Sequence, residues 1–222
     1  MRADFSPLCY FSEERQYIWI HVAKNASSTL RSIFGNDLYQ ARSCCYVDLP
    51  PHIRRGYTTI VFLRNPIERT LSAYQEVSLR ADTDEGYLTG RKFLGMPEGL
   101  DRFAVFLDEV SQDPWDGHVL SQSRFIQGIR VDLWGTVETI EADLARVCTR
   151  VNISRPEVIP KFRSRAERVA SGQYFAHDLD RQDLTPHLAK RILDIYREDY
   201  RLYQEVIRDR NYDCDEKQSA SG

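Results

Sequence analysis

Long hydrophobic runs are missing from this chain of 222 residues. No apolar stretch approaches the roughly 20 residues that a membrane-spanning helix needs. Residues 1–12 also lack the basic start and apolar core of a secretory signal peptide. We therefore expect a soluble, cytoplasmic protein without a membrane partner; a lumenal domain cut from a longer chain is the alternative.

Cysteine is scarce, and its spacing matches no familiar binding site. The number is odd and the spacing is not that of metal ligands. The two adjacent cysteines are poorly placed to bridge to each other. We expect reduced thiols throughout and no metal site. The cysteines are Cys9, Cys44, Cys45, Cys148 and Cys214.

Neither sign of charge is in large excess, because 30 Lys and Arg face 33 Asp and Glu. A net charge of −3 gives no reason to expect nucleic acid as a partner. Arginine far outnumbers lysine, and the guanidinium group is well suited to bind phosphates. No internal repeat or low-complexity linker divides the chain. We therefore predict a single domain over 1–222 with a disordered tail at about 212–222.

Hydrophobic patterning predicts an α/β fold in which strands alternate with helices. The segment 58–63 is almost wholly apolar, as expected for a central parallel strand that is covered on both faces. We expect a mainly parallel central sheet flanked by helices. The predicted strands are 17–22, 58–63 and 131–137, and the predicted helices are 28–34, one beginning at Pro66, 100–110, 139–151 and a single long helix that begins at 185–186.

The first candidate site follows a strand and opens a helix at residues 21–30. A helix N-terminus offers unpaired N–H groups and a positive dipole, which together favour an anion. Small residues at 26–28 let the backbone approach that anion closely, and Lys24 adds a mobile charge. The glycines of a Walker P-loop are absent, so this is a P-loop-like turn rather than an ATPase signature. The alternative is an ordinary capped helix with an exposed lysine.

The second candidate site lies where the strand 58–63 passes into the next helix. Arg64 stands at the carboxyl end of a parallel strand, where α/β sheets place their ligands. Ser72 follows about two helical turns later and is able to donate to the same anion. The alternative is that Arg64 and Arg69 pair with surface acids such as Glu68, and pairs of that kind contribute little stability.

These two segments resemble the donor-binding motifs of PAPS-dependent sulfotransferases, where PAPS is 3′-phosphoadenosine-5′-phosphosulfate. Residues 24–29 resemble the 5′-phosphosulfate loop, K-[NT]-[AG]-[SG]-[ST]-[ST]. Residues 64–74 resemble the 3′-phosphate motif, R-[ND]-P-x-x-R-x-x-S-A-Y. Both motifs occur in order and each follows a strand, so the pair is more specific than either motif alone.

Weaker similarity extends over roughly residues 15–205 and is closest to the carbohydrate (Golgi-type, sulfotransferase family 2) group. Residues 115–122 resemble W-x-x-H-x-x-P-Q, although Ser121 replaces the usual proline. Residues 135–140 resemble G-x-x-E-x-L. A later proline-containing segment resembles N-x-S or N-K-S, but Arg163 stands where asparagine is common.

The resemblance implies a sulfotransferase fold and transfer of a sulfuryl group from PAPS to a hydroxyl of a carbohydrate or small-molecule acceptor, releasing PAP. It implies that Lys24 stabilises the leaving phosphate oxygen and that no metal takes part. Arg64 and Ser72 would hold the 3′-phosphate. The further donor-binding residues that it implies are Asn25, Ala26, Ser27, Ser28, Thr29, Arg163 and Ser164.

A general base should take the proton from the acceptor hydroxyl, and histidine has a suitable pKa for this task. We favour His52 slightly over His118, although His52 precedes the strand that carries Arg64 and must fold back to reach its far end. Glu138 is a third candidate, with orientation of a helix start as its alternative role. The remaining histidines are interpreted as structural or surface residues: His21, His177 and His187.

Three other interpretations of the sequence stay open. A nucleotide kinase or other phosphotransferase would need a glycine-rich loop and a magnesium-binding carboxylate, and neither is evident. A catalytically silent PAP-binding protein would keep Lys24 and Arg64 without a base. A plain α/β interaction domain would leave the paired motifs unexplained. The sequence specifies neither the acceptor nor the oligomeric state.

Overall fold

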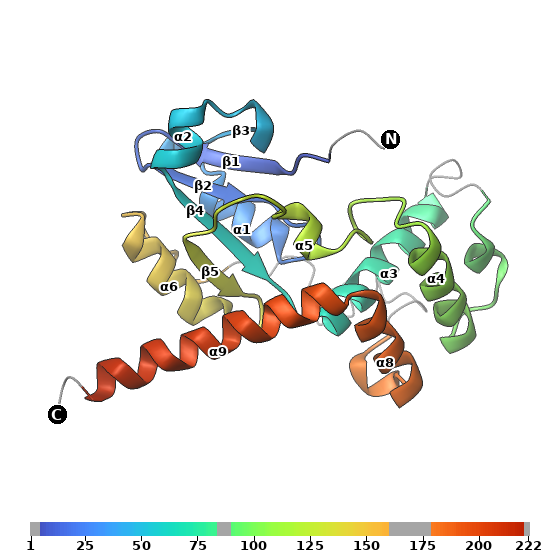
Figure 1. The fold of residues 1–222 in the computed structure, drawn as a ribbon. Helices are drawn as coiled ribbons and strands as arrows, with labels where there is room; N and C mark the ends of the chain where they lie inside the picture. The colour runs from blue at the N-terminus through green and yellow to red at the C-terminus, as the bar shows by residue number, and fades with distance from the viewer. Residues whose placement is uncertain (1–4, 84–89, 160–178, 220–222) are drawn as a thin grey trace.

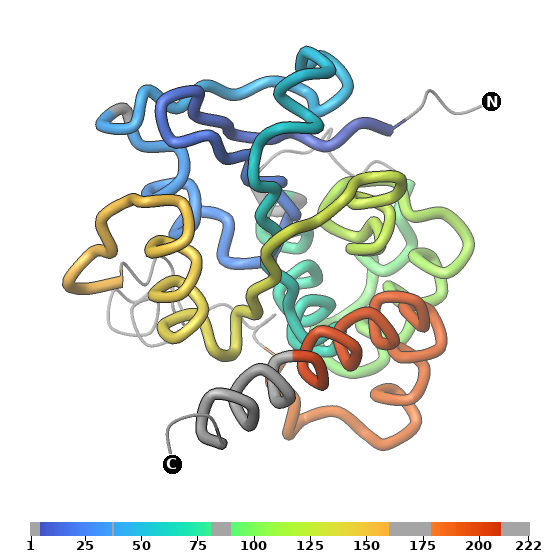
Figure 2. Tube along the Cα trace, turned by 60° about the vertical axis from the view of Figure 1, so that its left-hand side comes forward, coloured from blue at the N-terminus to red at the C-terminus, as the bar shows by residue number. Residues whose placement is uncertain are grey.

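The structure, a computed structural model, describes residues 5–83, 90–159 and 179–219 (Figures 1 and 2). A five-stranded sheet runs through the middle of this described part, with helices on both of its faces. Three strands form a parallel part, as the sequence predicts, and two more extend it in antiparallel fashion. In spatial order the strands are β3 (Arg42–Cys45), β1 (Leu8–Ser12), β2 (Tyr17–Ile20), β4 (Thr58–Leu63) and β5 (Leu133–Thr136).

The parallel part confirms the predicted central position of β4. Ile60 pairs with Trp19 of β2 on one side and with Leu133 of β5 on the other. Alternate side chains of β4 enter two different hydrophobic clusters, Phe62 on one face and Val61 on the other. An apolar run without alternation is the expected sequence of such a doubly covered strand.

The helices divide into those that cover the sheet and those that extend beyond its edge. α1 and α6 pack on one face of the sheet, and α2, α5 and α9 pack on the other. A separate hydrophobic cluster joins α3, α4 and α8. The helices are α1 (Ser27–Phe34), α2 (Pro51–Gly56), α3 (Pro66–Thr83), α4 (Leu100–Gln112), α5 (Gln122–Phe125), α6 (Ile140–Arg150), α8 (Pro186–Ile195) and α9 (Arg197–Ser219), with short 3₁₀ turns at Asp37–Tyr39, Tyr46–Asp48, Lys92–Gly95 and Arg181–Asp183. None of the helices within the described ranges is long and apolar enough to cross a membrane.

The single long helix predicted from residues 185–186 is wrong, because the structure divides it at Tyr196. This residue has φ −106° and ψ 39°, so α8 ends there and α9 begins in a different direction (Figures 1 and 2). The Tyr196 ring is buried, and its hydroxyl donates to the carbonyl of Val119 at 2.7 Å. A long-range contact therefore fixes the break. α9 extends to Ser219 and so includes part of the segment 212–222 for which the sequence predicts disorder.

Gly135 provides a test of the contact between β4 and β5. A Cβ added at Gly135 would lie 2.4 Å from the Phe62 ring, whereas nothing lies within 4 Å of a Cβ added at Gly56. We expect Gly135→Ala to lower the free energy of unfolding by about 1–3 kcal/mol, because the ring must leave its packed position. Gly56→Ala, the matched control, should change it by less than about 0.5 kcal/mol. Urea unfolding of both variants measures the difference, and equal values would contradict the close packing of the Phe62 ring on Gly135.

Candidate active site

An open cleft of about 650 Å³ lies where β2 and β4 end, which is the edge at which parallel sheets bind ligands. Its lining comes from the loop between β2 and α1, the exposed side of α3, the loop before α5 and the start of α6. A volume of this size is in the range of sites for nucleotide-sized molecules. The two predicted anion-binding segments therefore open into the same space.

The loop between β2 and α1 holds two non-glycine residues in left-handed backbone conformations. Lys24 has φ 68° and Ala26, at the N-cap of α1, has φ 54°. Each such conformation costs an L-residue roughly 1–2 kcal/mol, and backbone strain of this kind concentrates at functional sites. Left-handed turns bring successive N–H groups to one side and so create a concave anion site. The backbone of this loop is therefore shaped to receive an anion, although the loop contains no glycine.

Hydrogen bonds to neighbouring buried groups hold this loop in place. Asn25 is buried and donates from Nδ2 to the carbonyl of Phe62 at 2.8 Å and to Oε1 of Gln122 at 2.7 Å. The Ser27 hydroxyl donates to the carbonyl of Val22 at 2.9 Å. Asn25 therefore supports the loop and does not line the cleft, whereas Lys24 and residues 26–29 do.

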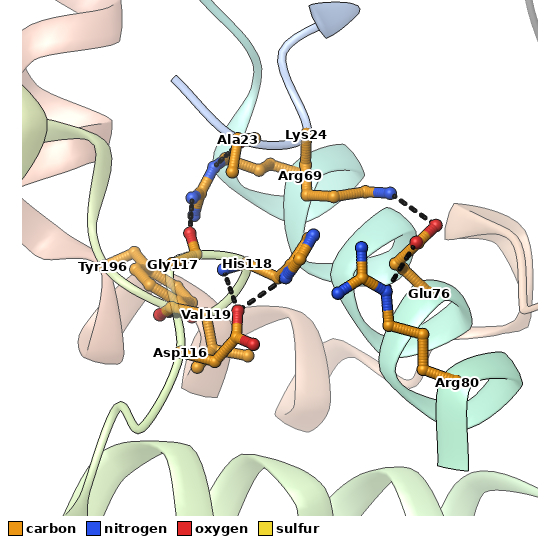
Figure 3. Close-up of polar contacts among 10 residues, drawn as sticks. All are labelled: Ala23, Lys24, Arg69, Glu76, Arg80, Asp116, Gly117, His118, Val119 and Tyr196. Carbon is orange, nitrogen blue, oxygen red and sulfur yellow. Dashed lines mark hydrogen bonds and ion pairs between the residues drawn. The ribbon is translucent and has the colours of Figure 1, made fainter. Parts of the chain in front are cut away.

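Lys24 is paired inside the cleft with a carboxylate of α3. Its Nζ lies 3.3 Å from Oε2 of Glu76, and Oε1 of the same carboxylate accepts from Nε of Arg80 at 3.0 Å (Figure 3). Burial raises the pKa of Glu76, but Lys24 and Arg80 outweigh it and lower that pKa overall. Glu76 is therefore ionised at neutral pH and forms an ion pair with Lys24 in this structure.

Arg64 and Ser72 reach the cleft from the end of β4 and from α3. Nη1 of Arg64 donates to the carbonyl of Lys24 at 3.2 Å, which connects the two anion-binding segments. The side-chain amide of Gln122 bonds both the N–H and the C=O of Arg64, each at 2.9 Å. Burial lowers the pKa of Arg64, yet an arginine stays charged after such a shift.

His118 enters the cleft from the loop before α5, beside Asp116. One oxygen of Asp116 lies 2.5 Å from both the backbone N–H and Nδ1 of His118 (Figure 3). An ionised carboxylate only accepts hydrogen bonds, so in the neutral ring the proton is assigned to Nδ1 and Nε2 is left as the acceptor. Figure 3 shows the ring lying between Asp116 and the Lys24–Glu76 pair. This arrangement suits a base that faces the cleft.

His21, which the sequence suggests is structural, also lines the cleft. Its ring packs edge-on against Trp19 at 5.7 Å between centroids. Burial lowers the pKa of His21, and the nearby Arg31 guanidinium lowers it further. The ring is therefore neutral at pH 7 and adds no charge to the anion site.

Other candidates lie away from this cleft or outside the described residues. His52 is exposed near the start of α2, which leads into the amino end of β4, and it is not part of the lining. Glu138 is exposed and accepts from the N–H of Asn65 at 2.8 Å, so it orients the start of α3 and is likewise absent from the lining. Arg163 and Ser164 lie outside the described residues.

Several residues of the site were not selected from the sequence. Glu76 follows Glu68 and Ser72 at intervals of four, and all three line the cleft from one face of α3. Residues four apart lie on the same face of a helix, so this spacing is the feature of the sequence that could have identified Glu76. Gln122 is the last residue of the segment that resembles W-x-x-H-x-x-P-Q, but that resemblance does not specify its contacts, which span 58 residues to Arg64 and 97 to Asn25. Within the described ranges, no group of three or more His, Cys, Asp or Glu side chains is placed to hold a metal ion.

Comparison with known families places the whole cleft in one matched region. A family model described as the sulfotransferase family matches residues 7–204. The comparisons with curated proteins and with solved structures give no match. The matched region includes both anion-binding segments, the Asp116–His118 loop and the cleft-lining face of α3.

Proposed function

The chain belongs to the sulfotransferase family, and on this basis we propose that it transfers a sulfuryl group from PAPS to a hydroxyl of a carbohydrate or small-molecule acceptor and releases PAP. The observation that supports the proposal most is that two segments open into a single cleft. They are the loop between β2 and α1 (hereafter the α1 loop) and the Arg64–Ser72 segment. PAPS carries two separate anionic groups on one nucleoside. Two anion sites in one cleft fit that ligand better than a ligand with a single phosphate group.

The donor would lie across both segments. The N–H groups at the start of α1, with the hydroxyls of residues 27–29, would hold the 5′-phosphosulfate. Arg64 and Ser72 would hold the 3′-phosphate, which distinguishes PAPS from ATP-like nucleotides. Asn25 would contribute only by supporting the loop. Roles for Arg163 and Ser164 follow from the family resemblance alone.

The reaction needs an in-line arrangement of nucleophile, sulfur and leaving oxygen, with positive charge near the moving oxygens. The acceptor oxygen forms a bond to sulfur while the bond between sulfur and the 5′-phosphate oxygen breaks. His118 Nε2 takes the hydroxyl proton, and Lys24 stabilises the negative charge on the departing phosphate oxygen. Lys24 leaves Glu76 to do so, and Arg80 remains as the partner of that carboxylate.

PAP should stabilise the fold more than other adenine nucleotides do. At a hundredfold excess over Kd, ligand linkage adds about 2.7 kcal/mol to the free energy of unfolding. We expect a clear rise in Tm with PAP and a small one with AMP or ATP, because both lack the 3′-phosphate. A larger response to ATP with magnesium would contradict the proposal and favour a phosphotransferase.

Turnover separates an enzyme from a catalytically silent PAP-binding protein. The protein is incubated with ³⁵S-labelled PAPS and a panel of oligosaccharides, monosaccharides and phenols, and labelled products are separated from PAPS. We expect label on at least one hydroxyl compound together with an equal amount of PAP. Binding of PAP without labelled product for any acceptor would contradict the proposed reaction.

A further inference from the structure

A buried arginine joins the two loops that carry Lys24 and His118. Arg69 of α3 is 1% exposed. Its Nε donates to the carbonyl of Ala23 at 3.1 Å, and its Nη2 makes a longer contact of 3.5 Å to the carbonyl of Gly117 (Figure 3). Ala23 immediately precedes Lys24, and Gly117 immediately precedes His118. One guanidinium group therefore contacts both loops at the residue before each candidate catalytic side chain.

The other side of His118 is held from the C-terminal part of the chain. The buried Tyr196 hydroxyl donates to the carbonyl of Val119 at 2.7 Å, so the carbonyls on both sides of His118 have a fixed partner (Figure 3). Asp199, 1% exposed, accepts from the N–H groups of Gln122 at 2.7 Å and Ser123 at 2.8 Å. The loop that carries His118 is therefore anchored from α3 and from the α8–α9 junction.

The chemistry of Arg69 suits a geometric role. Burial of a cation is costly unless its donors are satisfied, and the carbonyls of Ala23 and Gly117 are acceptors for the buried guanidinium group of Arg69. Burial lowers the pKa of Arg69, while Tyr196 and Asp199 act against that shift. A planar guanidinium group donates in two fixed directions at once, whereas a lysine at this position would supply a single point of charge.

We propose that Arg69 is a positioning residue that sets the separation between Lys24 and His118, with Tyr196 fixing the far side of His118. The inference rests on the proposed sulfuryl transfer, in which these two side chains serve the leaving and the attacking oxygen. Arg69 does not line the cleft and so acts only through its neighbours. An error of about 1 Å in such an arrangement can lower the rate by about a hundredfold.

The first test compares two buried arginines. Arg102 of α4 is 5% exposed, forms an ion pair with Glu98 and does not line the cleft. Both Arg69→Met and Arg102→Met should lower Tm. At a temperature where both are folded, we expect Arg69→Met to lower kcat at saturating PAPS about a hundredfold, with PAP affinity changed by less than about threefold. An equal loss of kcat in the two variants, or a loss of PAP affinity alone, would overturn the proposal.

A second test needs no acceptor. Hydrogen exchange is followed at Asn25, whose N–H bonds Val22, and at Val119 and Leu120, whose N–H groups bond Asp116. Arg69→Met should speed exchange in both loops and Arg102→Met in neither. Tyr196→Phe, which removes one hydroxyl without changing the packing volume, should speed exchange only at Val119 and Leu120. Unchanged exchange in either loop of Arg69→Met would overturn the proposed connection.

A double-mutant cycle distinguishes positioning from an independent contribution. If Arg69 acts through His118, then Arg69→Met should lower kcat far less in a His118→Ala background than in the wild type. Additive losses would show that Arg69 does not act through His118 and would overturn the proposal. If the wild type transfers no sulfuryl group at all, the proposed function fails, and the exchange experiment still decides whether Arg69 connects the loops.

Discussion

Replacement of Lys24 with alanine should lower kcat at saturating PAPS by about 10²–10³-fold, the usual cost of losing one charge-stabilising group from a transition state. The ammonium group is needed mainly when negative charge appears on the departing phosphate oxygen. The fold should survive, because Glu76 keeps Arg80 as a partner after Lys24 is removed. Steady-state rates and PAP titration on the same preparation measure the effect.

Arg64→Ala is the matched comparison for Lys24→Ala. A hydrogen bond to a charged group contributes about 1.5–3 kcal/mol, which corresponds to roughly a 10- to 100-fold rise in Kd for PAP. We expect kcat at saturating PAPS to fall by less than about tenfold, since this charge serves the 3′-phosphate and not the reacting atoms. The division of roles is wrong if both variants lose only affinity and keep the wild-type kcat.

Replacement of His118 with alanine should lower turnover by roughly 10²–10⁴-fold, because the acceptor hydroxyl loses its base. Asp116 orients the ring and leaves Nε2 as the acceptor, so His118→Gln should not restore the rate. His52→Ala is the matched control. His52 is exposed and outside the cleft lining, so we expect its turnover to stay within about twofold of the wild type.

Turnover of three histidine variants identifies which group acts as the base. His118→Ala should be slow, and His52→Ala should turn over at close to the wild-type rate. A fast His118→Ala together with a slow His21→Ala would assign the base to His21. A slow His52→Ala variant would support the preference that the sequence alone suggested.

The elements that the sequence predicted well are those specified by local patterns. An unbroken apolar run predicts β4, and a strand followed by small and hydroxyl residues predicts the α1 loop. The two antiparallel strands β1 and β3 were missed. β3, at the edge of the sheet, is short, partly exposed and polar, and it is a strand only because β1 pairs with it. The break at Tyr196 was missed for a related reason. No proline or glycine marks it, and a hydroxyl contact to a distant carbonyl fixes it.

The same distinction applies to the site: local motifs identified some of its residues, and long-range contacts place the others. The motif residues Lys24, Arg64 and Ser72 converge because successive parallel strands end at one edge of the sheet. His52 lies apart because α2 feeds the opposite end of β4, and a strand advances about 3.3 Å per residue. Arg69 belongs to the matched 64–74 motif, but its contacts with the carbonyls of Ala23 and Gly117 follow only from the arrangement of the loops in space.

The anchor at the α8–α9 junction has a consequence for the order in which the protein assembles. Tyr196 and Asp199 bind groups that precede them by 76 or 77 residues in the chain. Synthesis runs from the N-terminus, so residues 119–123 are made before residues 196–199. The carbonyl of Val119 and the N–H groups of Gln122 and Ser123 therefore have water as their partner until Tyr196 and Asp199 have been made. Contacts of such long sequence separation also form slowly. The geometry around His118 is therefore complete only after Tyr196 and Asp199 have been synthesised and have docked.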